Sequence, residues 1–289
     1  MQEMLWKGIQ RRFINKIRCD TVIKHYSTDT FSLYSRLRNK NVFITGATSG
    51  IGQACAYNYA HAGANLIISG RRTERLEAIS NDIKSKYPSI KVIYTELDVR
   101  NKSQIDKAVS ALPKDFKNVD ILVNNAGLVI GLDKLVDTKV EDIDTMIDTN
   151  VKGLVYVTQA ILPTLKRTQG HIVNIGSIAG ENAYPNGSIY CASKHAVRAI
   201  TQSLRCELID TDVRITEINP GMVETEFSVV RFRGDEAKAK DVYRGIEPLK
   251  AQDIAELVLF STSRPKHVEI ATMTVFPHGQ ASATLTHRK

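Results

Sequence analysis

The amino-acid sequence from Asn41 to Gly52 is NVFITGATSGIG, an apolar run followed at once by a glycine-rich turn. The run is short and apolar, as expected of a strand buried in a parallel sheet. An apolar helical stretch then continues to Ala62, and Gly63 is a typical helix C-cap. Glycines let the backbone approach a ligand, and the N-terminus of the next helix offers free N–H groups to a pyrophosphate. This order of elements therefore favours nucleotide binding over an ordinary loop.

The alternation of strand and helix continues to the end of the chain. Short apolar runs predict the further strands, and the amphipathic or polar stretches between them predict helices. We expect strands at 65–69, 91–97, 120–123, 171–175, 213–218 and 268–276, and helices at 74–86, from about 140 toward 165, after 188, and at 251–262. This pattern predicts an α/β fold with a parallel sheet. Since no repeat or linker divides residues 39–289, we expect a single domain there.

The first 38 residues differ in charge from the rest of the chain. The net charge is +8, and residues 1–40 hold nine Lys and Arg against three Asp and Glu, whereas the remainder holds 30 against 28. Leu5, Ile9, Phe13 and Ile17 repeat every four residues among basic positions, which resembles a mitochondrial presequence. A flexible tail or a membrane-surface helix would share these features. We therefore separate residues 1–38 from the fold and expect a cytoplasmic or mitochondrial-matrix location.

Composition argues against several classes of protein. No uninterrupted apolar run approaches the ~18 residues that a membrane span needs. The cysteines, of which there are four, form no C-x-x-C pair and have no histidine at zinc spacing, so we expect a reducing compartment and no metal site. Beyond the leader the chain is nearly neutral and lacks a basic stripe, which argues against nucleic-acid binding.

The turn after the second predicted strand indicates which dinucleotide is bound. It reads Gly70-Arg71-Arg72 and contains no acidic residue. An acid at this turn usually binds the ribose 2′-hydroxyl of NAD, whereas an arginine accommodates the 2′-phosphate of NADP. The turn therefore favours NADP, with Arg71 as the first candidate and Arg72 as the second. The alternative is that both arginines are solvated charges at the start of a helix.

Small and polar residues also follow the next two predicted strands. Asp98-Val99 ends one of them, and the carboxylate could accept a hydrogen bond from an adenine amino group or cap the helix that begins near Lys102. The other strand leads into Asn124-Asn125-Ala126-Gly127. Amide and small side chains suit the approach of a ligand, although consecutive asparagines also simply make turns.

Tyr190 and Lys194 lie four residues apart in a predicted helix and therefore share one face. A neighbouring cation stabilises a phenolate and lowers the tyrosine pKa from its reference value of ~10. Reaching neutral pH requires a shift of ~3 units, so a second positive charge, such as an oxidised nicotinamide ring, is needed beside the lysine. The spacing alone is a weak signal, because Tyr-x-x-x-Lys occurs by chance in many helices.

These motifs together resemble the short-chain dehydrogenases/reductases in order and in spacing. The matching positions are Thr45-Gly46-x-x-x-Gly50-Ile51-Gly52, Asn124-Asn125-Ala126-Gly127, Ser177, Tyr190-x-x-x-Lys194 and Pro220-Gly221, within residues 41–277. The resemblance implies a single Rossmann-type doubly wound parallel sheet of about seven strands with helices on both faces. It also implies reversible hydride transfer between a carbinol carbon and the nicotinamide of NADP(H).

The resemblance implies a catalytic role for Asn150, Ser177, Tyr190 and Lys194. Tyr190 would be the general acid and base, Ser177 would orient the substrate oxygen, and Lys194 would bind the nicotinamide ribose and lower the tyrosine pKa. Asn150 would distort its helix and hold a water that links the lysine to solvent. The implied cofactor contacts are Gly46, Thr48, Ser49, Gly50, Ile51, Gly52, Arg71, Arg72, Asp98, Val99, Asn125, Ala126, Gly127, Tyr190, Lys194, Pro220, Gly221, Val223 and Thr225.

The polar segment at about 222–250 resembles a substrate-covering loop with a short helix. Its stretch 227–234, together with residues 177–180 and 183–185, is similar to the NADP-dependent 3-hydroxy acid dehydrogenases, which oxidise serine, L-allo-threonine and related small acids. A carboxylate substrate needs a cation, and arginine offers a planar fork of donors. We therefore expect Arg231 to bind substrate with Ser177, Tyr184 and Tyr190. The alternative is a solvated loop arginine.

Two other functions remain open. The first is a broader carbonyl, 3-oxoacyl or sterol reductase on the same scaffold, because a fold does not determine its substrate. The second is a non-catalytic NADPH-binding protein, against which the intact catalytic residues weigh. The resemblance also implies a homotetramer. We assign no role to the tail Thr284–Lys289.

Overall fold

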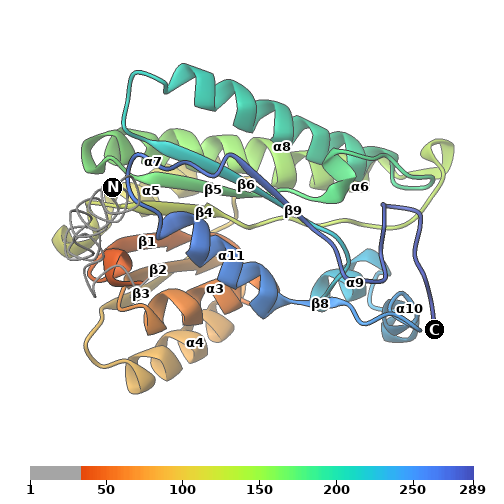
Figure 1. The fold of residues 1–289 in the computed structure, drawn as a ribbon, viewed down its shortest axis with the longest axis horizontal. Coiled ribbons are helices and arrows are strands. Elements are labelled where there is room, and N and C mark those ends of the chain that lie inside the picture. The colour runs from red at the N-terminus through yellow and green to blue at the C-terminus, as the bar shows by residue number, and fades with distance from the viewer. Residues whose placement is uncertain (1–33) are drawn as a thin grey trace, which may run out of the picture.

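The computed structural model describes residues 34–289, which form one central sheet with helices on both faces (Figure 1). The sheet has seven strands in the order β3-β2-β1-β4-β5-β6-β9, and every neighbouring pair is parallel. The strands are β1 (Asn41–Ile44), β2 (Asn65–Gly70), β3 (Val92–Glu96), β4 (Ile121–Asn124), β5 (His171–Ile175), β6 (Arg214–Pro220) and β9 (Thr272–Val275). The predicted doubly wound parallel sheet is therefore confirmed.

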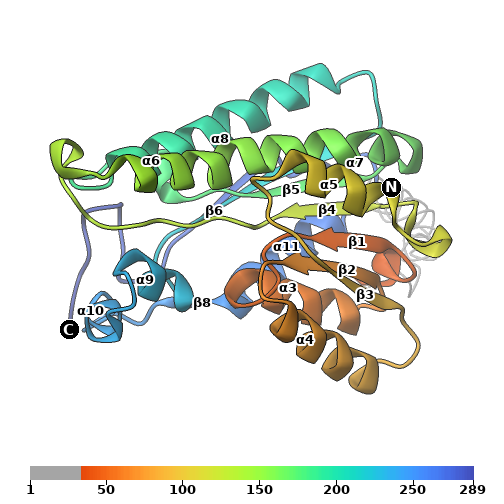
Figure 2. The same cartoon turned by 180° about the vertical axis from the view of Figure 1, so that it is seen from behind.

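Helices connect the strands and cover the sheet. Figures 1 and 2 show α3, α4 and α11 on one face and α5, α7 and α8 on the other. Their bounds are α3 (Gly50–His61), α4 (Thr73–Lys86), α5 (Lys102–Ser110), α6 (Val140–Ile147), α7 (Leu154–Thr168), α8 (Ser188–Glu207) and α11 (Ala251–Thr262). Short 3₁₀ turns occur at η2 (Ser35–Leu37), η3 (Lys114–Phe116), η4 (Leu135–Asp137) and η6 (Ile178–Gly180).

The alternation of side chains along β1 explains why its sequence is apolar throughout. Val42 and Ile44 pack into the cluster beneath α3 and α11, whereas Phe43 packs into the cluster beneath α5 and α7. Successive side chains of a strand point to opposite faces of the sheet. A strand covered on both faces therefore needs an unbroken apolar run, which is the pattern that predicted it.

The order of the strands reverses at β1. From β1 the chain adds β2 and β3 on one side, and then crosses to add β4, β5 and β6 on the other. The loops that follow β1 and β4 consequently diverge at the carboxyl edge of the sheet. Open parallel sheets bind their ligands in the crevice at such a reversal.

One long helix is interrupted by a wider turn. The helices α6 and α7 are joined by the π-helical segment η5 (Asp148–Gly153), which contains Asn150. Asn150 is buried, and its side chain bonds both the N–H and the carbonyl of Leu128. The helix is thus irregular at the asparagine, and π-helical turns are frequently found at functional sites.

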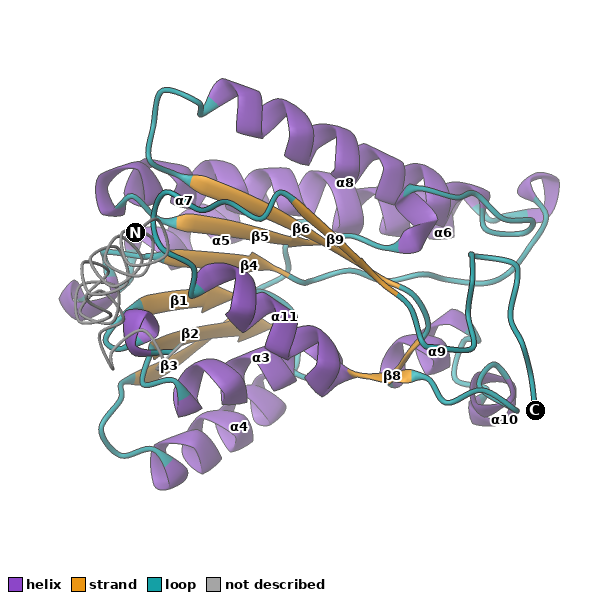
Figure 3. Cartoon of the chain, viewed as in Figure 1, coloured by secondary structure: helices purple, strands orange, loops and turns teal. Residues whose placement is uncertain are grey.

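The segment at 222–250 holds more regular structure than its sequence predicts. It contains two short helices, α9 (Glu226–Arg231) and α10 (Glu236–Asp241), between the paired strands β7 (Val223–Glu224) and β8 (Leu249–Lys250). The side chains of Thr225 and Asp235 cap the two helices. Figure 3 shows both helices beyond the carboxyl edge of the sheet, beside the end of β6.

The packed fold begins before the boundary that we placed at residue 38. Leu37 is 1% exposed and belongs to the core, and the Arg36 guanidinium donates to the carbonyl of Ser263 at 3.1 Å. These residues were grouped with the leader because their neighbours are polar and basic. The features that suggested a presequence lie at residues 1–33, outside the described residues.

The chain ends against the substrate loop rather than against the sheet. The backbone N–H of Lys289 donates to the carbonyl of Gly245 at 2.9 Å, and the Arg288 guanidinium donates to the carbonyl of Val242 at 3.2 Å.

The last strand, β9, is shorter than predicted because Arg214 binds the carbonyls of Arg264, Pro265 and Val268 and holds them in a turn. Within residues 34–289 no helix combines the length and the apolar character of a membrane span.

Candidate active site

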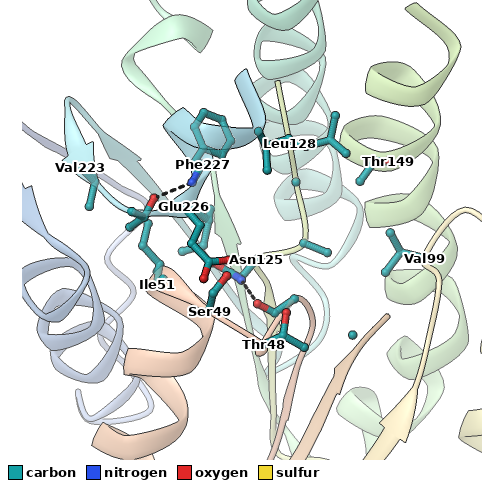
Figure 4. Close-up of a pocket in the computed structure, with 18 of the residues that line it drawn as sticks. Thr48, Ser49, Ile51, Val99, Asn125, Leu128, Thr149, Val223, Glu226 and Phe227 are labelled. Atoms are coloured by element: carbon teal, nitrogen blue, oxygen red, sulfur yellow. Dashed lines mark hydrogen bonds between the residues drawn. The ribbon is translucent and has the colours of Figure 1, made fainter. Parts of the chain in front are cut away.

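A cavity of about 340 Å³ opens at the carboxyl edge of the sheet, at the reversal between β1 and β4. Its walls come from both halves of the sheet and from α8 and α9 (Figure 4). The predicted site residues that line it are Gly46, Thr48, Ser49, Gly50, Ile51, Arg71, Arg72, Asp98, Val99, Asn125, Ala126, Gly127, Ser177, Tyr190, Lys194, Pro220, Gly221, Val223 and Thr225. Four other predicted residues, Gly52, Asn150, Tyr184 and Arg231, do not line it directly.

The glycine-rich turn after β1 depends on its glycines for two separate reasons. Gly46 and Gly50 have φ values of +65° and +54°, a region that side chains disfavour. Gly52 instead permits close packing, because a Cβ there would lie 2.5 Å from the Gly46 carbonyl oxygen and 2.4 Å from Asn125 Nδ2. Gly52 therefore shapes the turn without facing the cavity. The N-terminus of α3 is left open toward the cavity, which suits a phosphate.

Asn125 ties the end of β4 to the turn after β1. Its Nδ2 donates to the carbonyls of Thr45 and Gly46 at 2.9 and 3.0 Å, and the Thr45 hydroxyl accepts the N–H of Asn125 and that of Ala126. Figure 4 shows Asn125 directed at this turn. Asn124 has a different role, because it is buried and bonds Thr158 and Asn174 beneath the sheet.

The two arginines after β2 differ in their contacts. Arg72 donates to the Thr48 hydroxyl at 2.7 Å, to the Ser49 hydroxyl at 2.8 Å and to the Glu226 carboxylate at 2.8 Å. Arg71 is exposed and lines the same cavity, and no hydrogen bond of its side chain is found within residues 34–289. Arg71 therefore offers the more available guanidinium, while Arg72 links the turn to α9.

Asp98 does not cap the helix that follows it. The cap of α5 is Asn101, whose side chain accepts the N–H of Gln104 at 3.0 Å. The Asp98 carboxylate instead binds Arg100 at 2.5 Å, and this hydrogen bond holds the pKa of the carboxyl below its ordinary value. The capping alternative is therefore wrong. Asp98 and Val99 remain in the wall of the cavity beside Arg71.

Ser177, Tyr190 and Lys194 meet at the far end of the cavity. Ser177 follows β5, and its N–H donates to Asn219 Oδ1 at 3.0 Å. Tyr190 and Lys194, in the first two turns of α8, are 6% and 7% exposed. Lys194 Nζ lies 5.9 Å from the centre of the Tyr190 ring and donates to the carbonyl of Ile175 at 2.8 Å. The structure therefore brings together the serine, tyrosine and lysine that the sequence singled out.

Burial moves the pKa values of Tyr190 and Lys194 in opposite directions. Desolvation raises the pKa of Tyr190 above its ordinary value and the neighbouring Tyr184 adds to this, while hydrogen bonding with Ser177 and the charge of Arg231 act against it. Desolvation lowers the pKa of Lys194 to about 8. Both groups therefore favour their neutral forms more than they would in water. In the absence of a ligand, the cation that lowers the tyrosine pKa is Arg231.

Arg231 lies behind two residues of the cavity wall, against the rings of Tyr190 and Phe227. Its guanidinium carbon is 5.9 Å from the centre of the Tyr190 ring and 5.6 Å from that of Phe227, and Nη2 lies 3.5 Å from the Tyr184 hydroxyl. Its Nε is buried and has no hydrogen-bond partner within residues 34–289. A buried donor without an acceptor is unfavourable, so this position suits an anionic ligand.

Several residues of the site were not predicted. Phe227 and Val230 of α9 and Leu128 after β4 give the cavity an apolar wall, and the Phe227 ring packs edge-on against Tyr190 at 5.8 Å. Glu226 of α9 also lines the cavity and pairs with Arg72 and Arg75. The sequence offers one signal for Phe227: it lies two residues after Thr225, which was predicted to contact the cofactor, so the chain is close to the site at this point.

The fold and the site together define a dehydrogenase of the short-chain type that uses a nicotinamide dinucleotide. The residues present fit such a cofactor, because the left-handed glycines, the open N-terminus of α3 and the Arg71 guanidinium line one cavity. The chain belongs to this family: the sequence model described as short chain dehydrogenase matches residues 40–235. The family predicted from the motifs is thus confirmed.

Individual relatives resemble almost the whole described chain. It is 46% identical over 257 residues to the NADP-dependent 3-hydroxy acid dehydrogenase of Schizosaccharomyces pombe, covering 88% of this chain and 99% of that protein. It is 47% identical over 242 residues to the sulfoacetaldehyde reductase of Chromohalobacter salexigens, covering 83% and 94%. The solved closed form of serine dehydrogenase complexed with NADP⁺ superposes with a TM-score of 0.81 at 42% identity, covering 86% and 100%.

Proposed function

We propose that this protein is an NADP-dependent oxidoreductase that acts reversibly on the hydroxyl-bearing carbon of a small 3-hydroxy acid, of the serine, allo-threonine or 3-hydroxypropionate type. The observation that carries this proposal is Arg231, whose buried and unpaired Nε lies beside the Tyr190 ring. A carboxylate two bonds from the reacting carbon would reach the arginine while its hydroxyl meets the tyrosine. The names of the relatives from Schizosaccharomyces pombe and of serine dehydrogenase support this assignment.

The proposed catalytic residues act on the proton of the substrate hydroxyl. When bound, the nicotinamide accepts or supplies the hydride. Tyr190 takes the hydroxyl proton during oxidation and returns it during reduction, and Ser177 hydrogen-bonds the same oxygen. Lys194 binds the ribose and, with Arg231, favours the phenolate. Asn150, whose side chain bonds the backbone of Leu128 in the π-helical turn, would hold the water that links Lys194 to solvent.

The proposed cofactor residues divide according to the part of NADP(H) that they meet. Gly46, Thr48, Ser49, Gly50 and Ile51 would hold the pyrophosphate, with Gly52 shaping their turn. Arg71 would bind the 2′-phosphate, and Arg72 would support it through its hydrogen bonds to Thr48 and Ser49. Among the other lining residues, Asp98 and Val99 would meet the adenine, Asn125, Ala126 and Gly127 the ribose, and Pro220, Gly221, Val223 and Thr225 the nicotinamide.

A second candidate substrate is a small hydroxy sulfonate or its aldehyde. The relative named sulfoacetaldehyde reductase favours it, because that protein is 47% identical to this chain. A sulfonate and a carboxylate are both anions that a guanidinium binds. Broader carbonyl, 3-oxoacyl or sterol substrates carry no anionic group beside the reacting carbon, so they would leave the Arg231 Nε without a partner.

We also propose an organisation and a location. Residues 39–289 make up the catalytic domain together with Arg36 and Leu37, which pack against it, with 222–250 as its substrate loop. The leader comprises the residues before them. The catalytic domain assembles as a homotetramer. The location is cytoplasmic, or the mitochondrial matrix if the leader directs import. Gel filtration with light scattering would test the tetramer. Imaging of a C-terminal fluorescent fusion with and without residues 1–33, a deletion that keeps the core residue Leu37, would test the location.

Reduction of NADP⁺ by the purified protein tests the substrate class. We expect turnover with serine, allo-threonine or 3-hydroxypropionate, and little with uncharged alcohols or a sterol. Replacing Arg231→Ala should lower kcat/KM for the acids by roughly 10- to 100-fold, since a hydrogen bond to a charged group contributes about 1.5–3 kcal/mol. Equal losses for acids and uncharged alcohols would contradict an anion-binding role of Arg231.

A further inference from the structure

The buried carboxylate of Glu217 has no part in the mechanism above. Glu217 lies on β6 and is 1% exposed, and neither of its oxygens has a hydrogen-bond partner within residues 34–289. Burying an ionised carboxylate is unfavourable unless opposite charges or donors compensate. Perturbed and buried ionisable groups cluster at functional sites, so a buried carboxylate without a partner on this strand indicates a functional role.

Glu217 lies directly beneath the turn that carries Ser177. A Cβ added to Gly176 would stand 2.8 Å from Glu217 Oε1 and 2.0 Å from Asn219 Oδ1. That asparagine oxygen also accepts the backbone N–H of Ser177 at 3.0 Å. The side chains of Glu217 and Asn219 therefore occupy the space beneath Gly176 and support the catalytic turn from below.

The charged groups around Glu217 come from two other segments. Lys194 Nζ donates to the carbonyl of Ile175, the residue before Gly176, at 2.8 Å, and Arg198 lies one turn further along α8. Both cations act on Glu217 electrostatically. Arg198 also pairs with Glu181, after η6, at 3.3 Å, and Glu181 in turn accepts hydrogen bonds from Asn219 on β6 and Thr274 on β9. An ionised Glu217 thus balances the two positive charges of α8 together with Glu181. Without it, this partly buried cluster would carry an excess positive charge.

The interaction between Glu217 and Lys194 is mutual. Burial lowers the pKa of Lys194 to about 8, and the charge of Glu217 acts in the opposite direction by raising it. Burial raises the pKa of Glu217, Arg198 and then Lys194 oppose this, and Glu181 adds to the increase. Each group therefore favours the charged form of the other.

We propose that Glu217 is a positioning residue that acts as the counter-charge of Lys194 and thereby sets the pH range in which the enzyme turns over. This proposal rests on the proposed function, in which a charged Lys194 binds the ribose and favours the Tyr190 phenolate. Glu217 does not touch substrate or cofactor. It acts from beneath the site, through the lysine ammonium and through the support that it gives to the Ser177 turn.

The first experiment is the pH profile of kcat/KM for NADP⁺-dependent oxidation by Glu217→Gln. Glutamine keeps the shape of the side chain and removes its negative charge, so every proton-binding group nearby becomes more acidic. We expect both limbs of the profile to move to lower pH by roughly one unit. Glu217→Asp, which keeps the charge, should retain the original pH range even if its rate falls.

Glu269→Gln is the matched control. Glu269 is an exposed carboxylate that meets the backbone N–H of Ile215 at the opposite, amino-terminal end of β6. Its replacement changes the same net charge and should leave the pH profile in place. If Glu217→Gln also leaves both limbs in place while lowering the rate, Glu217 merely fills the space beneath Gly176 and the proposal is wrong.

A second experiment requires neither substrate nor cofactor. A double-mutant cycle of Glu217→Gln and Lys194→Met, followed by urea unfolding, measures the interaction between the two side chains directly. We expect a favourable coupling at pH 6.5 that disappears at pH 10, where the lysine is neutral. Absence of coupling at pH 6.5 would overturn the proposal. A protein that shows the coupling but oxidises no hydroxy acid would instead contradict the proposed function alone.

Discussion

The tyrosine at the centre of the site is less acidic in this structure than its neighbours in sequence suggest. Lys194, four residues along α8, directs its ammonium to the carbonyl of Ile175, 5.9 Å from the centre of the Tyr190 ring. Burial meanwhile raises the tyrosine pKa. A helix places two side chains on one face but does not determine where their ends lie. The ribose hydroxyls of a bound cofactor would give the lysine a second acceptor and join it to the phenol.

Replacing Tyr190→Phe tests its role as acid and base. The phenyl ring keeps the edge-on contact with Phe227, so the fold should persist while the proton-transfer group is lost. We expect kcat to fall by about 10²- to 10⁴-fold, the usual contribution of a general acid or base. Steady-state NADP⁺ reduction measures this. Tyr156→Phe, at a half-buried tyrosine in the first turn of α7, is the control, and comparable activity of the two variants would rule out the assignment.

The preference for NADP should depend on Arg71 more than on Arg72. Arg71 is free to meet a 2′-phosphate, whereas Arg72 already binds Thr48, Ser49 and Glu226. We expect Arg71→Ala to raise the KM for NADP⁺ by roughly 10-fold or more, as loss of a charged hydrogen bond implies, and to change the KM for NAD⁺ little. Parallel titrations with the two cofactors measure this. A larger discrimination by Arg72→Ala would reverse the assignment.

At this scale the sequence identifies residue types better than contacts. Ser177, Tyr190 and Lys194 could be found because they occur with the glycine-rich turn in the order and spacing of the short-chain dehydrogenases/reductases. The sequence does not assign Phe227 to the site, although it closely follows Thr225, because an aromatic residue in a polar segment has no periodic partner to indicate which way it faces. The role of Asp98 was ambiguous because a carboxylate before a helix can bind several kinds of partner. In the structure it binds the Arg100 guanidinium.

The helix α9 connects the two ends of the site. At its start, Glu226 pairs with Arg72 and Arg75 on the cofactor side, at 2.8 and 2.6 Å. At its end, Arg231 lies against Tyr190. One short element therefore contacts the region proposed for the 2′-phosphate and the region proposed for substrate. Its sequence is too short to predict a helix by periodicity, and the Thr225 cap and these ion pairs determine its place.

Removing the ion pairs that Glu226 makes with Arg72 and Arg75 should weaken the contact between α9 and the cofactor side of the site. All three side chains are partly exposed, and exposed ion pairs contribute little. We therefore expect Glu226→Gln to raise the KM for NADP⁺ and for NAD⁺ by a similar, roughly two- to five-fold factor. Glu236→Gln on α10 provides a control with the same charge change. A decrease in the KM for NADP⁺ alone would show instead that Glu226 competes with the 2′-phosphate for Arg72.

The sheet of the whole molecule was predictable because strands that are buried on both faces have unbroken apolar sequences. Strands such as β1 must be apolar throughout, and the turns that follow them must be small or polar where a ligand approaches. The start of the fold has no such apolar run. Leu37 precedes the first strand in a basic stretch, yet it packs against the core beneath α3 and α11.

Leu37→Ala tests whether the fold truly begins before residue 39. The leucine is 1% exposed and belongs to the largest apolar cluster, so its truncation leaves a cavity that the neighbours fill only in part. We expect the free energy of unfolding to fall by about 2–5 kcal/mol, measured by urea denaturation of the full chain. Leu135→Ala, at a side chain that is 58% exposed, is the matched control and should change it by less than about 0.5 kcal/mol. Equal effects at the two positions would return Leu37 to the leader and restore the boundary at residue 38.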